Sequence, residues 1–175
     1  MDKVVIFADH TIGYWLTEYL LQNQKNYFIA DVYTNETANA WWDDLRLLQN
    51  YYPIKIKLFD PDTTYLELKK TNPDYLLLLS WKHLIKKNIL ENVKVCTVNL
   101  HYSLLPKHRG VYPVNWAIYS GDTETGITFH IVDEKVDNGP IVGQLTEKIS
   151  VFDDAFSLIQ KLDILALKLF KKNMG

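Results

Sequence analysis

Short apolar runs alternate along the first hundred residues with stretches in which apolar residues recur at helical spacing. The apolar runs predict strands at 4–8, 27–33, 54–59, 75–79 and 93–100. The stretches between them predict helices at 11–21, 35–50, 64–70 and 82–92. The run 75–79 is apolar throughout, which is typical of a central parallel strand that is buried on both faces.

The pattern changes after position 100, where a loop punctuated by proline and glycine covers 101–112. Further elements are predicted as a helix at 113–119, strands at 126–132 and 141–149, and a closing amphipathic helix at 153–172. Pro113 is well placed to open the first of these helices. The closing helix has Asp153 or Asp154 as its N-cap and lysines in its last turn.

The alternation of strands and helices predicts an α/β fold. Consecutive β-α-β units imply right-handed crossovers and a Rossmann-like, doubly wound and mostly parallel sheet. No repeat, linker or low-complexity stretch interrupts the sequence. We therefore expect a single domain over 1–175, with no second domain after it.

Composition and charge narrow the class of protein. The net charge of −2 gives no basic surface of the kind that marks a nucleic-acid partner. No apolar stretch approaches the roughly 20 residues that span a membrane, and no signal peptide precedes the first strand. The one cysteine, Cys96, lies in the apolar run 93–100 and is expected to be a buried structural thiol. These features together predict a cytoplasmic protein.

Four loops lie where ligands of open α/β sheets bind, beyond the carboxyl ends of the strands. They are the loops at 9–13, 80–83, 101–112 and 133–139. The first lacks the glycine spacing of a dinucleotide-binding loop, and no Gly-rich loop is followed by Lys and Ser or Thr to hold a phosphate. Redox and nucleoside-triphosphatase functions are therefore disfavoured.

The loop at 101–112 is the densest in candidate chemistry. Asn99 and His101 are two residues apart where a predicted strand ends, so their side chains point the same way. An isolated Asn-x-His pair would be read as an ordinary strand end. A long string of specific apolar and aromatic residues follows this pair, however, and a surface loop needs such a string only when it lines a pocket.

Two segments carry a resemblance to a known family. Asn99-Leu-His101-Tyr-Ser103-Leu-Leu-Pro106-Lys-His-Arg109-Gly110, continuing to Trp116-Ala-Ile118, resembles the folate-dependent formyltransferases. So does Gly126-Ile-Thr128-Phe-His130, which leads into Asp137-Asn-Gly139-Pro-Ile141. The resemblance covers the whole chain as the N-terminal catalytic domain of that family. It implies that 10-formyltetrahydrofolate is the formyl donor, that no metal takes part, and that the catalytic residues are Asn99, His101 and Asp137.

Formyl transfer gives each of these residue types a task. An amine attacks the formyl carbonyl, and negative charge develops on the carbonyl oxygen. Asn99 and a protonated His101 are suitable donors to that oxygen. A histidine also titrates near neutrality and can move the proton of the amine. Asp137 would orient His101 and favour its charged form, or relay the proton through water; on its own it would be read as a turn residue before Gly139.

Contacts with each of the two substrates are also expected. The folate contacts that the resemblance implies are Trp81, Lys82, His83, Leu84, Ile85, Leu105, Asp133 and Val136. The acceptor contacts are expected from the loops at the ligand end of the strands, where charged side chains can face an anionic substrate; they are His10, Thr11, Lys82, His108 and Arg109. Two of these have a plain structural alternative, because Trp81 could be a core residue and Lys82 a solvated one. His130 is read as a satisfied sheet histidine that lies near the acidic loop.

Several acceptor amines stay open within the family. Methionyl-tRNA enzymes carry a second, basic domain, which this slightly acidic sequence lacks. The purine-pathway enzyme usually has a Gly/Ser/Asn-rich loop after its first strand, and the loop 9–13 departs from that pattern. We therefore expect a nucleotide-linked amino sugar, with glycinamide ribonucleotide as the alternative. A non-catalytic folate- or nucleotide-binding module, a formyl-folate hydrolase, a homodimer and a truncated chain also stay open.

Overall fold

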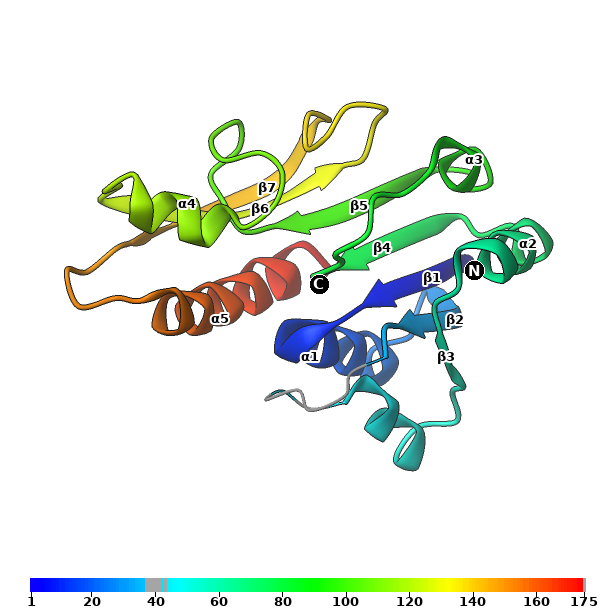
Figure 1. Ribbon diagram of the computed structural model, residues 1–175. Coiled ribbons are helices and arrows are strands. Elements are labelled where there is room, and N and C mark those ends of the chain that lie inside the picture. The colour runs from blue at the N-terminus through cyan, green and yellow to red at the C-terminus, as the bar shows by residue number, and fades with distance from the viewer. Residues whose placement is uncertain (37–41, 43, 175) are drawn as a thin grey trace. The chain divides into compact units, whose positions relative to one another are not determined.

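The computed structural model describes residues 1–36, 42 and 44–174 (Figure 1). The chain divides into two compact units, Met1–Val98 and Asn99–Gly175. No helix within the described ranges is long and apolar enough to cross a bilayer.

The first unit is built on four parallel strands in the order β3-β2-β1-β4. These strands are β1 (Asp2–Ala8), β2 (Tyr27–Thr34), β3 (Ile56–Leu58) and β4 (Tyr75–Leu79). β1 lies between β2 and β4, and its side chains from Val5 to Ala8 are fully buried. The parallel order with helical crossovers confirms the predicted α/β class and its Rossmann-like topology.

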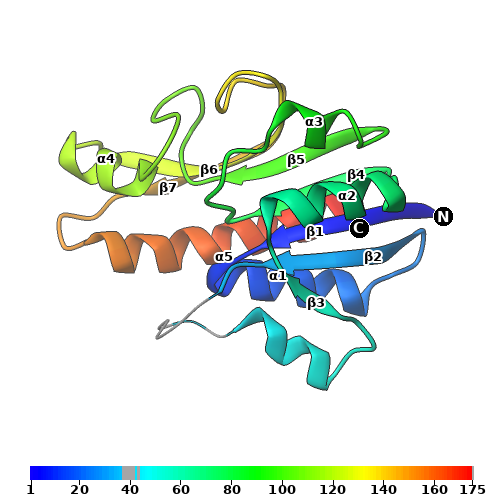
Figure 2. The same cartoon turned by 45° about the vertical axis from the view of Figure 1, so that its right-hand side comes forward.

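Local capping residues define the helices of the first unit. Asp9 caps α1 (His10–Gln22) by accepting a hydrogen bond from the backbone N–H of His10. Asp60 caps α2 (Pro61–Thr71), which ends at Asn72 in the left-handed conformation. Figure 2 shows α2 in front of the strands of this unit and α1 behind them, so the sheet is covered on both faces.

Three predictions for the first unit need correction. The helix expected at 35–50 is a 3-10 helix over Leu45–Asn50; Asn35 and Glu36 are not helical, and 37–41 and 43 lie outside the described residues. The helix expected at 82–92 is only α3 (Lys87–Leu90); Ser80 has a positive φ, Lys86 is extended, and residues 81–86 are not helical. The loop expected at 9–13 is helical from its second residue.

The second unit contains an antiparallel hairpin and two helices. The hairpin consists of β6 (Glu124–Ile131) and β7 (Ile141–Lys148). α4 (Pro113–Tyr119) starts at the predicted proline, and α5 (Ala155–Met174) follows Asp154, which accepts the N–H of Ser157. α5 packs on both strands of the hairpin, with the ring of Phe170 5.6 Å from that of Phe129. The remaining strand, β5 (Cys96–His101), starts at the end of the first unit and finishes in the second.

Cys96 is half-buried rather than fully buried. Burial raises the pKa of its thiol, which opposes formation of the reactive thiolate. A structural role therefore fits this cysteine better than a nucleophilic one.

Two glycines that belong to the family-like segments are required by close packing. A Cβ atom at Gly126 would lie 2.1 Å from the carbonyl oxygen of Leu145 and 2.6 Å from Cδ2 of Leu104. A Cβ atom at Gly139 would lie 1.9 Å from the carbonyl oxygen of Ile131. Since both carbonyls belong to the backbone of the hairpin, neither can move away without disturbing the strand pairing.

We predict that Gly126→Ala lowers the free energy of unfolding by about 1–3 kcal/mol or more, because the new methyl group must displace a strand. Urea denaturation of the full chain measures this change. Gln160→Ala, on an exposed position of α5, is the control and is expected to stay within about 0.5 kcal/mol of the parent chain. Equal stability of the two variants would contradict the close packing at Gly126.

Candidate active site

Two polar side chains, those of Asn99 and His101, point to the same side at the end of β5. Asn99 and His101 are separated by Leu100, which is 3% exposed, so strand alternation directs the two polar side chains together. This arrangement agrees with the sequence pattern that first pointed to the pair. The rest of the site comes from the loop after β5, from β6 and from the loop after β6.

His101 lies between two acceptors. Its Nδ1 is 3.5 Å from Oδ2 of Asp137, and the side chains of the two residues are 7% and 13% exposed. Its Nε2 donates a hydrogen bond of 2.8 Å to the backbone carbonyl of His108. Because a carbonyl oxygen can only accept, Nε2 of His101 carries a hydrogen, and Nδ1 is the atom that gains or loses a proton.

Asp137 connects the parts of the site. Its Oδ2 accepts the backbone N–H of Gly110 at 2.8 Å, and its Oδ1 lies 3.5 Å from Nδ2 of Asn99. Burial raises the pKa of this carboxyl, but the contact with His130, the charge of His101 and the Gly110 N–H together hold it below the ordinary value. Asp137 is therefore ionised at neutral pH.

Burial is also the largest influence on the pKa of His101, and in this residue its effect is larger than the opposing effects together. It lowers the pKa of the imidazole below its ordinary value, against the opposing effects of Asp137 and of the His108 carbonyl. His101 is consequently neutral at neutral pH and can accept a proton on Nδ1. A buried base beside an ionised carboxylate is an arrangement suited to proton transfer.

His130 belongs to this site, although the sequence indicated only a sheet histidine near the acidic loop. It is 1% exposed, and its Nδ1 donates to the backbone carbonyl of Ile131 at 3.0 Å. Its Nε2 then accepts from Nδ2 of Asn99 at 3.1 Å and lies 3.4 Å from Asp137. His130 thus orients the amide of Asn99. Its position near the acidic loop was the available signal, but a strand histidine does not reveal its partner.

Thr128 and Gln144 of the hairpin hold the loop that follows β5. The Thr128 hydroxyl donates to the carbonyl of Ser103 at 2.7 Å, and Gln144 Nε2 donates to Thr128 Oγ1 and to the carbonyl of Leu105. Leu105, an implied folate contact, is 6% exposed, and its backbone is fixed by these bonds. The polar residues of the family-like segment 126–130 therefore support the loop.

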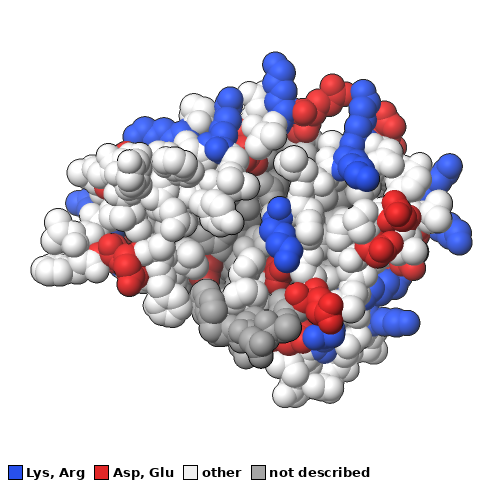
Figure 3. Space-filling model, viewed as in Figure 1, with Lys and Arg blue, Asp and Glu red and all other residues white. Residues whose placement is uncertain are grey.

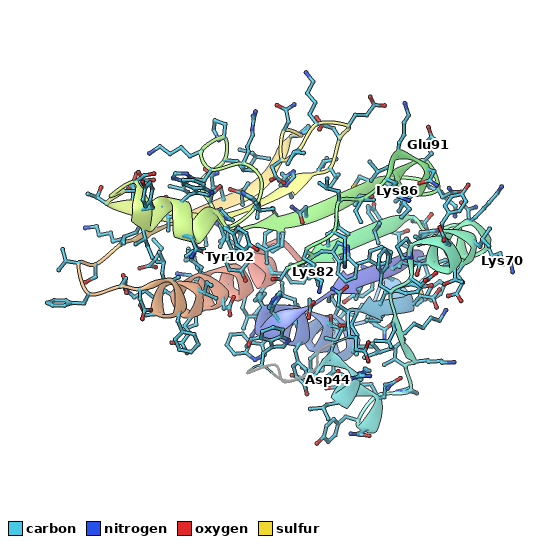
Figure 4. The ribbon with its side chains drawn as sticks, in the orientation of Figure 1. Asp44, Lys70, Lys82, Lys86, Glu91 and Tyr102 are labelled. Atoms are coloured by element: carbon cyan, nitrogen blue, oxygen red, sulfur yellow. The ribbon has the colours of Figure 1, made fainter. Side chains whose placement is uncertain are left out.

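Tyr102 points away from its neighbour His101 and fixes the loop to α5. Its hydroxyl donates to Asp163, which is 5% exposed (Figure 4 labels Tyr102, which lies beside α5). Burial raises the pKa of Asp163 to about 6, and the hydrogen bond from Tyr102 offsets only part of this effect. Burial likewise raises the pKa of Tyr102.

The remaining predicted residues of the second unit lie in loops. Val136 is 50% exposed, and Asp133 accepts hydrogen bonds from the backbone of Lys135 and the side chain of Asn138. Arg109 is exposed. The ring of His108, which the sequence predicts to contact the acceptor, is paired with a carboxylate of its own chain, Asp122, at 2.7 Å.

In the first unit, a hydrogen-bonded chain joins the ends of three strands. Asp9 accepts the Asn35 amide at 2.8 Å, and Oδ1 of Asn35 lies 2.7 Å from Nε2 of His83. Asp9 and Asn35 are 3% and 7% exposed, and neither was predicted from the sequence. His10 Nδ1 lies 3.1 Å from the hydroxyl of Ser80. The predicted residues His10 and His83 are therefore held by buried polar partners.

The structure shows how Trp81 and Lys82, in the loop after β4, are placed. Trp81 packs against Phe7 and Phe59 at ring distances of 5.1 and 5.0 Å, and its side chain is half-buried at the edge of the core. Its buried indole nitrogen has no hydrogen-bond partner in the described part of the chain. Lys82, labelled in Figure 4, and Leu84 are exposed. Thr11 and Ile85 are half-buried.

Positive and negative side chains are interspersed on the face shown in Figure 3. Among the residues that the structure describes, no group of three His, Cys, Asp or Glu side chains is arranged to hold a metal ion.

Comparisons with known proteins agree with this fold. The family model described as "Formyl transferase" matches residues 5–172. The chain therefore belongs to the formyl transferase family.

Two curated relatives match different shares of this chain. The methionyl-tRNA formyltransferase of Thermodesulfovibrio yellowstonii is 40% identical over 103 residues, which cover 59% of this chain and 33% of that protein. The bifunctional polymyxin resistance protein ArnA of Wigglesworthia glossinidia brevipalpis is 29% identical over 98% of this chain and 27% of its own length. The chain thus spans about a third or less of the length of these two relatives.

The similar solved structures include formyltransferases with different named substrates. A phosphoribosylglycinamide formyltransferase from Bacillus halodurans is 25% identical and superposes with a TM-score of 0.82 over 98% of this chain and 92% of its own. An N-formyltransferase from Helicobacter canadensis, solved with folinic acid and dTDP-3-aminofucose, is 27% identical, with a TM-score of 0.79 over 99% of this chain and 63% of its own.

We predict that stability falls as pH rises through about 6, because the folded state holds the proton of Asp163 more tightly than the unfolded state does. As the pH rises from about 5 to about 8, the loss of the Asp163 proton should lower the free energy of unfolding by about 1.4 kcal/mol. Asp163→Asn should remove that dependence, so its stability relative to the parent should improve by that amount over the interval. Urea midpoints at the two pH values measure the difference, and a gap that does not change with pH would contradict the raised pKa.

Proposed function

We propose that this chain transfers a formyl group from 10-formyltetrahydrofolate to a primary amine, with Asn99, His101 and Asp137 as its catalytic residues. The observation that carries the proposal is the buried contact of His101 and Asp137 beside Asn99, in a chain of the formyl transferase family. The presence of folinic acid with the related N-formyltransferase supports a folate donor.

The chemistry follows from the protonation states at the site. The amine nitrogen attacks the formyl carbon, and the carbonyl oxygen becomes negatively charged. Asn99, whose amide His130 orients, donates to this oxygen. The attacking nitrogen releases a proton, which the neutral Nδ1 of His101 accepts, and Asp137 stabilises the resulting imidazolium. The bond from the formyl carbon to the folate nitrogen then breaks, and that nitrogen takes up a proton.

Several contacts with the donor remain predictions of the sequence. We keep Trp81, Lys82, His83, Leu84 and Ile85, together with Leu105, Asp133 and Val136, as the proposed folate-contacting residues. For Trp81, Leu105 and His83 the structure shows internal contacts, so their proposed role is to shape the surface that the folate meets. Val136, Lys82 and Leu84 have exposed side chains that can reach a ligand directly.

For the acceptor, we propose a nucleotide-linked amino sugar. The segment 9–13 departs from the Gly/Ser/Asn-rich composition expected after the first strand of the purine-pathway enzymes, and a related structure holds dTDP-3-aminofucose. A diphosphate would gain charge-assisted hydrogen bonds from Lys82 and Arg109. Glycinamide ribonucleotide is the second candidate, and the almost complete overlap with a phosphoribosylglycinamide formyltransferase favours it.

Removing a member of the catalytic set should stop turnover without unfolding the chain. We predict that Asn99→Ala, His101→Ala and Asp137→Ala each reduce kcat about 100-fold or more, because each removes a group that acts on the transition state. Asn26→Ala, an exposed asparagine at the start of β2, is the matched control and should keep full activity. Normal turnover by a folded His101→Ala protein would refute the assignment.

The acceptor is tested by offering amino-sugar nucleotides and glycinamide ribonucleotide with 10-formyltetrahydrofolate and measuring the mass gain of one formyl group. We expect transfer to a sugar nucleotide, and a higher KM for that acceptor, with little change for the folate, in Lys82→Gln and Arg109→Gln. Lys70→Gln, on the exposed surface of α2, is the charge-matched control. Transfer to glycinamide ribonucleotide alone would overturn the sugar assignment, and release of formate without transfer would identify a hydrolase.

A further inference from the structure

The loop that follows β5 contacts the catalytic pair through its backbone. The carbonyl of His108 accepts from Nε2 of His101, and the N–H of Gly110 donates to Oδ2 of Asp137, both at 2.8 Å. Backbone atoms have no rotamers of their own, so these two contacts exist only while the loop keeps one conformation. Whatever fixes this loop therefore also fixes the catalytic pair.

The loop conformation is one that most side chains avoid. His108 has a φ of 50° and Gly110 a φ of 90°, both in the left-handed region. Glycine adopts this region without steric cost, whereas a histidine with a Cβ atom does not. His108 therefore needs an interaction that holds it in place.

That interaction is the pair between His108 and Asp122. Nε2 of His108 lies 2.7 Å from Oδ2 of Asp122, and the two side chains are only 19% and 20% exposed. Asp122 is itself fixed at the end of α4, where its N–H donates to the carbonyl of the fully buried Ala117 at 3.0 Å. The pair thus fastens the loop to the end of a packed helix.

We propose that His108 and Asp122 are positioning residues, whose pair holds the His108 carbonyl against Nε2 of His101 so that His101 exchanges its proton at Nδ1, beside Asp137. The catalytic meaning of this proposal rests on the proposed function, but the tautomer of His101 that it specifies does not.

The Asp137 carboxylate and the His108 carbonyl compete for the one N–H of the neutral His101 ring, and this competition determines its tautomer. A neutral imidazole has one N–H, and the carboxylate of Asp137 would attract it to Nδ1. The His108 carbonyl holds it at Nε2 instead, which leaves Nδ1 free to accept a proton. The titratable groups that face His101 are Asp137, whose charge favours protonation of His101, and His130 and His108, whose protonation opposes it. If the loop is released, Nδ1 should keep the hydrogen and the basic atom becomes Nε2, on the wrong side of the ring.

The tautomer of His101 can be measured on the intact chain without substrate. The chain has five histidines, and long-range proton–nitrogen spectra of 15N-labelled protein separate the two ring nitrogens of each. The signals of His101 are identified by their loss in His101→Gln. In the parent chain we expect Nε2 to stay protonated while Nδ1 titrates. In His108→Asn and Asp122→Ala we expect the neutral ring to carry its hydrogen on Nδ1. Asparagine is chosen because it tolerates positive φ but is too short to reproduce the imidazole contact.

Measurements of kcat, KM and the pH profile distinguish a positioning role of His108 and Asp122 from direct contact with a substrate. The two variants and their double mutant should show the same loss of kcat, about 10-fold or more, with both KM values within about twofold and the acid limb of the pH profile displaced. Lys161→Gln breaks an ion pair of the same length, 2.7 Å, elsewhere in the second unit and should change none of these readouts.

An unchanged His101 tautomer in both variants would overturn the proposal, as would a higher acceptor KM with an unchanged kcat. Asp122→Asn, which keeps a neutral acceptor for His108, replaces Asp122→Ala if that chain does not fold, and an intermediate tautomer ratio is then expected. A chain that shows the expected spectra but no formyl transfer would refute the proposed function and leave the positioning role intact.

Discussion

The arrangement of the second unit depends on one buried carboxylate. Asp137 lies at a positive φ, after the hairpin strand β6, and contacts three groups of β5 and of the loop that follows it: the amide of Asn99, the ring of His101 and the N–H of Gly110. Burying a charge is costly unless such partners compensate for it. Asn99 and His101 each have a second bond, to His130 and to the His108 carbonyl, so the position of the charge is tied to the geometry of the whole site.

The fold was largely predictable because hydrophobic periodicity specified most elements. β4 and the helix opened by Pro113 have the predicted bounds, and α1, α2 and α5 differ from prediction by a few residues. The two helices that failed, at 35–50 and 82–92, had apolar or polar composition compatible with a helix but no start signal. Ser80 takes the left-handed conformation immediately after β4, and that choice, made by tertiary context, cannot be seen in the composition.

The site was predictable only in part, for a related reason. Asn99 and His101 were found through strand alternation, and Asp137 through the resemblance to a family. Neither signal shows which atoms pair across the fold. The bond from Asn99 to His130, and that between His108 and Asp122, join residues whose types are common in loops and strands and whose spacing carries no period. Their roles come from the loop conformation, and local sequence does not specify it.

The division of the chain into two units bears on how such enzymes diversify. The proposed chemistry uses groups of Asn99–Gly175 alone, whereas His10, Thr11 and Lys82 belong to Met1–Val98. Substitutions after β1 and β4 can therefore accumulate without disturbing a single bond of the proposed catalytic set. A lineage that explores new acceptors would retain its reaction during the search. In directed evolution, randomisation is accordingly best confined to the segments that follow β1 and β4 in the first unit, with the segment from Asn99 to Gly110 left intact.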